Sequence, residues 1–177
     1  MNKTKGFLYA ASVCLAMAFT FSCSSDGRGN NIGDYGTVVI GTQTWMAKNL
    51  NYAVEGSKCG DENNQLVDNN TVYCDEYGRL YDWQTALTVC PSGWHLPSDE
   101  EWDELENSTD AHGFLATLGG YGSDGLFFNV GGSGTWWSAA ESDSNYAHGR
   151  HIVYNDSNLY RGISGKSGLF SVRCVGD

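Results

Sequence analysis

Two short polar stretches near the end of the chain carry side chains that could bind a ligand. Asp143, Asn145 and Tyr146 lie in the stretch 141–146. The stretch 155–161 carries residues of the same kinds, namely Asp156, Asn158, Tyr160 and Arg161. Carboxylate and amide groups hydrogen-bond hydroxyls, and tyrosine rings offer flat apolar faces with a polar tip. We predict that these two stretches form one ligand face, for a carbohydrate or a surface protein.

The same oxygen atoms raise the question of calcium, which prefers carboxylate and amide oxygens. Tripeptides such as Glu-Pro-Asn or Gln-Pro-Asp, which hold calcium in some sugar-binding proteins, are absent, and Tyr154-Asn155-Asp156 only partly resembles the Trp-Asn-Asp that follows them there. Asp, Asn and Ser are also the residues that β-turns need for their geometry. We therefore expect no cofactor, with calcium as a minor hypothesis.

Trp136 and Trp137 are a further candidate for stacking against a sugar. Adjacent residues of a strand point to opposite faces, so one indole could be buried and the other exposed. The alternative that we favour is that both are buried, because aromatic rings carry a large apolar surface that folding readily buries.

No group of residues has the sequence context of a catalytic or metal site. His148 and His151 are three apart in a predicted strand, so they face opposite ways and make a poor metal pair. His95 follows a tryptophan in a stiff loop and is expected to be a structural hydrogen-bonder. Residues 120–125 match the pattern G-x-G-x-x-G, but no apolar strand precedes them and no helix clearly follows. We predict that the protein is not an enzyme.

The helices that must position these residues are visible in the hydrophobic pattern. Residues 83–89 predict a first helix, with Asp82 as its N-cap. Residues 99–107 predict a second helix, because Ser98 and Glu101 have the spacing of a capping box. A further helical turn or two is predicted around 114–118.

The rest of the chain predicts strands and turns. A β-hairpin is expected over 38–47, a short return strand over 72–74 and a glycine-rich loop over 119–134. The final third predicts an antiparallel sheet with strands 135–140, 146–154, 159–163 and 169–175. This order of hairpin, two helices and sheet predicts an α+β fold.

Composition and charge narrow the class of protein. Only 18% of the residues are charged and 13% are aromatic, which argues against disorder and against a helical bundle. The formal net charge is −11, so there is no basic surface for a nucleic acid, and we expect no nucleic-acid partner.

The N-terminus predicts export. Lys3 and Lys5 precede an apolar run that is too short to span a membrane comfortably and suits a signal peptide over 1–22. The run ends at Cys23 in a pattern that looks like a bacterial lipoprotein signal, with ordinary secretory cleavage as the alternative. Residues 23–34 then read as a flexible tether to a domain over 35–177. Cleavage removes two positive charges from −11 and leaves −13.

Four cysteines remain in the predicted domain, and an exported protein with an even number is expected to form disulfides. Three pairings are conceivable for Cys59, Cys74, Cys90 and Cys174. Zinc is the rival, but no two of them have the short C-x-x-C spacing. A bond from the first helix to the last strand would tie the helix onto the sheet, so we predict Cys90–Cys174 and Cys59–Cys74.

Several long motifs, in a consistent order, resemble one family. They are Gly41 to Tyr52, Tyr77 to Trp83 with Ala86, Cys90 to Trp102, Trp136 to Ala139 and Ser171 to Val175. Over residues 35–177 the chain is similar to the Fibrobacter succinogenes major paralogous domain, found in exported bacterial proteins. The resemblance implies a fold related to C-type lectins and to the formylglycine-generating enzyme, but no established activity. The chain departs from it between Leu118 and Thr135, where a longer segment is usual.

From these observations we expect a lipid-anchored binding module with a C-type-lectin-like fold on the outer membrane or surface of a Gram-negative bacterium. Its partners would be the membrane, through the anchor at Cys23, and a polysaccharide or surface protein. Two alternatives stay open: a structural or assembly subunit of the envelope without a small ligand, and an enzyme like the formylglycine-generating relatives.

Overall fold

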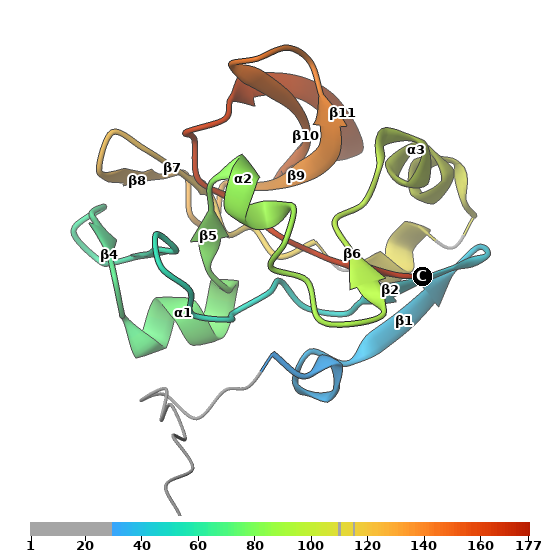
Figure 1. The fold of residues 1–177 in the computed structure, drawn as a ribbon, viewed down its shortest axis with the longest axis horizontal. Coiled ribbons are helices and arrows are strands. Elements are labelled where there is room, and N and C mark those ends of the chain that lie inside the picture. Colours follow the sequence, from blue (N-terminus) through green and yellow to red (C-terminus); the bar gives the residue numbers. More distant parts are fainter. Residues whose placement is uncertain (1–29, 110, 115) are drawn as a thin grey trace, which may run out of the picture.

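The structure is a computed structural model that describes residues 30–109, 111–114 and 116–177 (Figure 1). The predicted signal peptide over 1–22 and the predicted lipidation site Cys23 lie outside the described residues. The described end of the predicted tether is ordered against the domain. Asn30 Nδ2 donates a hydrogen bond to Val89 O over 2.9 Å, and residues Ile32–Asp34 form the 3-10 helix η1.

The first half of the domain alternates short strands with two short helices. Its elements are β1 (Thr37–Ile40), β2 (Gln43–Met46), β3 (Cys59–Gly60), β4 (Leu66–Val67), α1 (Thr71–Tyr77), β5 (Leu80–Tyr81) and α2 (Trp83–Ala86).

The second half contains the longest helix and the three longest strands. Its elements are β6 (Trp94–His95), α3 (Asp99–Asn107), η2 (Ala111–Phe114), β7 (Tyr121–Ser123), β8 (Leu126–Phe128), β9 (Ser133–Glu141), β10 (Tyr146–Val153), β11 (Asp156–Gly165), β12 (Phe170–Ser171) and β13 (Val175–Gly176).

Within the described residues, the strands form two main sheets and two small hairpins. The four-stranded sheet has the order β1-β2-β13-β6, so the last strand lies between elements from the start and the middle of the domain. The five-stranded sheet has the order β11-β10-β9-β12-β5, and β9, β10 and β11 curl together at the top of Figure 1. The described domain is therefore α+β, mostly strand with few helices.

The second predicted helix has the predicted bounds. Ser98 Oγ accepts from Glu101 N, and the Glu101 carboxylate accepts in return from Ser98 N, which closes the capping box. Trp102 and Leu105 are buried on its inner face. Local capping chemistry therefore determined this helix.

Other predicted elements were wrong. Residues 72–74 belong to helix α1 instead of a strand, because Asn70 Oδ1 accepts from Val72 N and Tyr73 N and so caps a helix. The first predicted helix starts at its N-cap Asp82 as expected but ends at Ala86 rather than Val89.

The C-terminal strand prediction was wrong in a different way. Residues 169–175 form two strands in different sheets, since β12 pairs with β9 and β5 whereas β13 pairs with β2 and β6. The predicted loop over 119–134 contains the β7–β8 hairpin. The helical turn predicted around 114–118 lies earlier, in η2, and Leu115 is outside the described residues.

Both predicted disulfides are present. Cys59 bonds to Cys74 and Cys90 bonds to Cys174. The second bond fastens the segment after α2 to the segment between β12 and β13. It therefore joins the middle of the domain to its last strands.

The described part of the chain has two core clusters, one on each side of the long strands. Trp137 belongs to the first and stacks on Phe170 with ring centroids 4.1 Å apart. Trp136 belongs to the second, beside Trp102, and its Nε1 donates to Asn49 Oδ1 over 2.8 Å. Both indoles have no exposed surface, so the favoured alternative of two buried rings is confirmed.

Candidate functional site

The structure does not bring together the two stretches predicted as a ligand face. Tyr146 begins β10 opposite Gly165, whereas Asp156 begins β11 opposite Val153, at the other end of the same antiparallel pair. Tyr146 and Val153 are the two ends of this 8-residue strand, roughly 23 Å apart at the usual rise per residue.

The acidic residues of both stretches hold turns. Asp143 Oδ1 accepts hydrogen bonds from Asn145 N and Tyr146 N at the start of β10. Asp156 Oδ1 accepts from Asn158 N at the start of β11. These are the local side-chain-to-backbone bonds that Asp forms in turns, which accounts for the residue types without a ligand.

Asp156 also fixes an aromatic stack. Tyr160 Oη donates to Asp156 Oδ2 over 2.6 Å, and this bond lowers the pKa of Asp156 and raises the pKa of Tyr160. The Tyr160 ring stacks on His151, its partner on β10, with centroids 5.4 Å apart. Tyr160 thereby positions His151.

His151 lies on the wall of a groove of about 440 Å³ between the β9–β10–β11 face and the β7–β8 hairpin. Such a volume is in the usual range for a small-molecule site. The groove is lined by Tyr121, Gly122, Ser123, Asn129, Ser133, Thr135, Gly149, Arg150, His151, Val153, Gly162, Ile163, Ser164, Gly168 and Phe170. Because these residues come from five strands and two loops, we take this groove as the candidate site.

Backbone contacts hold the hairpin beside the sheet. Gly120 forms a bridge with Gly134, and Gly122 forms one with Leu169. The ring of Tyr121 stacks on Phe128 at 5.3 Å and meets Phe170 edge-on at 6.4 Å. The groove wall is thus fixed by both backbone and ring packing.

Two facing glycines form the floor of the groove, and they differ in what the fold requires. Gly149 and Gly162 are partners in the β10–β11 register. A Cβ on Gly149 would meet the Trp136 carbonyl oxygen at 2.8 Å, so packing demands glycine there. A Cβ on Gly162 would meet His151 Nδ1 at 3.7 Å, an ordinary contact. The fold alone therefore does not explain Gly162, whereas a ligand lying on the strand would.

The groove offers neutral hydrogen-bonding groups. Ser133, Thr135 and Ser164 supply hydroxyls, each of which can donate and accept. Among the described residues, no hydrogen bond reaches a ring nitrogen of His151, so that ring can serve a ligand.

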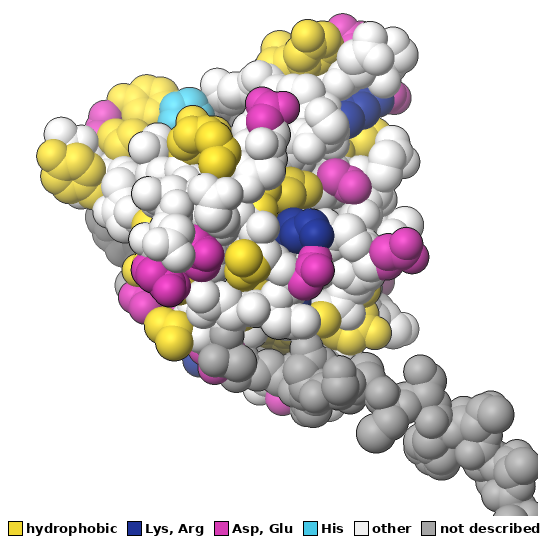
Figure 2. Space-filling view, turned by 90° about the vertical axis from the view of Figure 1, so that its left-hand side faces the viewer, with side chains coloured by type: hydrophobic (Ala, Val, Ile, Leu, Met, Phe, Trp, Pro, Cys, Tyr) yellow, Lys and Arg dark blue, Asp and Glu magenta, His cyan; other side chains and the backbone are white. Residues whose placement is uncertain are grey.

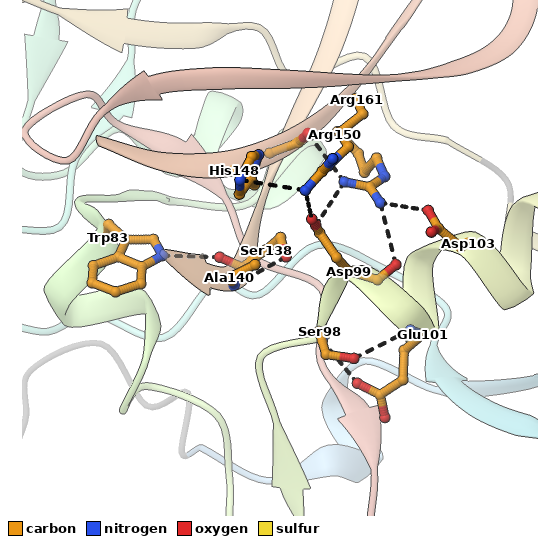
Figure 3. A network of polar contacts seen from close by, with 11 residues as sticks. Trp83, Ser98, Asp99, Glu101, Asp103, Ser138, Ala140, His148, Arg150 and Arg161 are labelled. Atoms are coloured by element: carbon orange, nitrogen blue, oxygen red, sulfur yellow. Dashed lines mark hydrogen bonds and ion pairs between the residues drawn. The ribbon is translucent and has the colours of Figure 1, made fainter. Parts of the chain in front are cut away.

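The opposite face of the strands is occupied by an ion-pair network with α3 (Figure 3). Arg150 Nη1 lies 2.8 Å from Asp99 Oδ1, and its Nη2 lies 2.7 Å from Asp103 Oδ1. Arg161 was predicted to lie on the ligand face. Its Nη2 lies 2.5 Å from Asp99 Oδ2 and 3.3 Å from His148 Nε2. Arg161 therefore binds helix α3, away from the groove.

Asp99 is held ionised by this network. Burial raises its pKa, but hydrogen bonds from Ser138, Arg150 and Arg161 outweigh burial and lower it below 3.8. His148 thus points toward α3, whereas His151 stacks on Tyr160 across the sheet, as their spacing predicted. His95 is a structural hydrogen-bonder, as expected, between Asp177 and Glu101.

Sequence reasoning missed the groove residues, apart from noticing the glycine-rich stretch before β9. Small hydroxyl residues and glycines carry no motif, and the groove forms only when strands far apart in the chain meet. The available signal was Gly162, a glycine in the middle of a predicted strand.

The described ranges contain no group of three or more His, Cys, Asp or Glu side chains that could hold a metal ion. None of their helices has the length and apolar character needed to cross a bilayer.

The described fold is a mostly β, disulfide-tied α+β domain with an open groove beside its longest strands. Residues 38–112 match the model of the Fibrobacter succinogenes major domain, so this segment of the chain is similar to that family. No curated protein and no solved structure matches the chain.

Proposed function

We propose that this protein is an exported, lipid-anchored binding module of the cell envelope, without catalytic activity, and that its groove binds a carbohydrate. The observation that carries the proposal is Gly162, whose missing side chain keeps the groove floor open although packing leaves room for one. Tyr121 and His151 supply ring surfaces at the wall, and three hydroxyls supply polar contacts.

A C-type-lectin-like fold is part of the proposal. It is supported by the order of hairpin, helices and sheet, by the central position of the last strand beside β2, and by the Cys90–Cys174 bond. The anchor at Cys23 and an outer-membrane or surface location rest on the signal pattern in the sequence.

The alternatives have weaker support. A structural or assembly subunit would need no groove, and a surface protein as ligand would not require position 162 to lack a side chain. An enzyme like the formylglycine-generating relatives needs redox-active thiols, but all four cysteines of the described domain are in disulfides.

The test fills the groove floor with one side chain. We expect Gly162→Leu to weaken binding to any glycan that the wild-type protein recognises on a glycan array by about tenfold or more, since tenfold corresponds to roughly 1.4 kcal/mol of lost contact. Affinities are then measured by calorimetry, and thermal unfolding checks that the variant remains folded.

Gly165→Leu is the matched control, on the same strand but the opposite face. A Cβ there would meet nothing within 4 Å, and the groove does not include this residue. Wild-type binding by Gly162→Leu, equal loss in both variants, or an array without any signal would each contradict the proposal.

A further inference from the structure

The groove is a neutral surface on an acidic protein. The chain has a formal net charge of −11, and Figure 2 shows more acidic than basic side chains on the side of the molecule where β7 and β8 lie. Among the described residues that line the groove there is no Asp, Glu or Lys, and the only charged residue is Arg150.

Arg150 cannot serve a ligand in the groove. Its side chain is fully buried, and its two terminal nitrogens are bound to Asp99 and Asp103 on the α3 side of the strands. Within the described part of the chain, the other cations near these strands are also paired: Arg161 with Asp99 and Lys166 with Glu141.

An anionic ligand would therefore enter this groove at a cost. It would lose hydration without gaining a cationic partner, and it would approach a protein of the same sign of charge. A cationic ligand would be attracted from a distance but would find no carboxylate inside, so its charge would also stay unpaired. Either charge is disfavoured within the groove.

The polar groups that remain suit uncharged hydroxyls. Ser133, Thr135 and Ser164 can each donate and accept, as each sugar hydroxyl can. The Gly162 floor lets a ring lie directly against the strand, between His151 and Tyr121.

On the basis of the proposed function, we infer that the ligand segment in the groove is a neutral glycan, and that acidic polysaccharides are rejected. The selectivity lies in the absence of charge from the groove rather than in a charged contact.

The experiment compares two forms of one ligand. The array carries neutral and uronic-acid hexasaccharides, and a neutral hexasaccharide that binds is tested again after its primary hydroxyls have been oxidised to carboxylates. Calorimetry is run at low and at physiological salt. We expect the oxidised form to bind about tenfold or more weakly, most of all at low salt, where repulsion is least screened. Binding of the neutral form should change by less than about twofold with salt.

The outcomes separate the inference from the proposed function. If an acidic hexasaccharide binds as tightly as a neutral one and loses affinity in Gly162→Leu but not in Gly165→Leu, the inference is overturned and the groove function stands. If no hexasaccharide of either kind binds, the proposed function falls, and the inference falls with it.

Discussion

At the scale of the residue, Asp99 is the central contact of the polar network in Figure 3. It is the first residue of α3 and binds Arg150 on β10 and Arg161 on β11. Arg150 has no exposed side-chain surface, so its charge depends on carboxylates for compensation. A buried ion pair adds little to stability compared with apolar packing of the same volume. Removing one partner, however, leaves the other charge buried and unpaired.

We expect Asp99→Ala to destabilise the domain by about 3 kcal/mol, because the buried guanidinium of Arg150 loses its most buried partner. Asp103→Ala is the comparison: its side chain is 63% exposed, and the loss should stay below about 1 kcal/mol. Urea unfolding of the two variants measures both free energies. Equal effects of the two substitutions would contradict the assignment of Asp99 as the main partner of Arg150.

At the scale of the element, His95 joins three parts of the fold. It lies on β6. Its Nε2 is 2.9 Å from Glu101 Oε1 at the start of α3, and its Nδ1 is 2.7 Å from Asp177 Oδ1 after β13. Burial lowers the pKa of His95, but the hydrogen bonds to Asp177 and Glu101 outweigh burial and raise it above the ordinary 6.5. The joint is therefore strongest when the ring is protonated.

Because its pKa is raised, His95 makes the stability of the domain depend on pH. A raised pKa in the folded state means that the stabilisation by His95 is fully present below pH 6.5 and is lost as the pH rises through the higher folded pKa. We expect His95→Gln to reduce the free energy of unfolding more at about pH 6 than at about pH 8. Asp177→Asn keeps the His95 ring but removes one of its two carboxylate partners. In this variant, the extra stability that His95 gives at the lower pH should therefore be smaller. A variant effect that does not change with pH would contradict this.

Elements with local signals were predictable from the sequence, whereas the division of residues 169–175 between two sheets depends on tertiary pairing and was not predicted. Helix α3 has a capping box between Ser98 and Glu101, so neighbouring residues determine it. Helix α1 was missed because Val72, Tyr73 and Cys74 favour strands, whereas the cap from Asn70 decides the matter.

The candidate site shows the same limit at longer range. Asp143 and Asp156 were singled out for their chemistry, but their oxygens bond neighbouring backbone and side-chain groups. The groove depends on the register that places Gly162 opposite Gly149 and on bridges that hold β7 beside the sheet. The turn that joins β10 to β11 sets their register locally, but the bridges to β7 join residues far apart in the chain, and no local pattern encodes them.

At the scale of the whole molecule, the fold is closed by contacts between distant parts of the chain. Val175 pairs with Trp45 of β2 and with His95 of β6, so the last strand joins the start of the domain to its middle. Cys90–Cys174 acts next to this junction and closes a loop of sequence separation 84, whereas Cys59–Cys74 closes one of 15. The longer loop should constrain the unfolded chain more.

The loop lengths predict unequal effects of the two disulfides on stability. Replacing both Cys90 and Cys174 by Ala should lower the free energy of unfolding by about 4.5 kcal/mol, against about 3 kcal/mol for Cys59 and Cys74. Urea unfolding of the two double variants measures the difference.

Cys90 and Cys174 also adjoin the junction of β13, so their loss should make the backbone amide protons of β2 and β6 exchange faster with solvent. The Cys59 and Cys74 variant should leave those amides protected, because its bond ties β3 to α1. Equal destabilisation, or exposure of β2 amides in both variants, would contradict the assignment of Cys90–Cys174 as the bond that closes the fold.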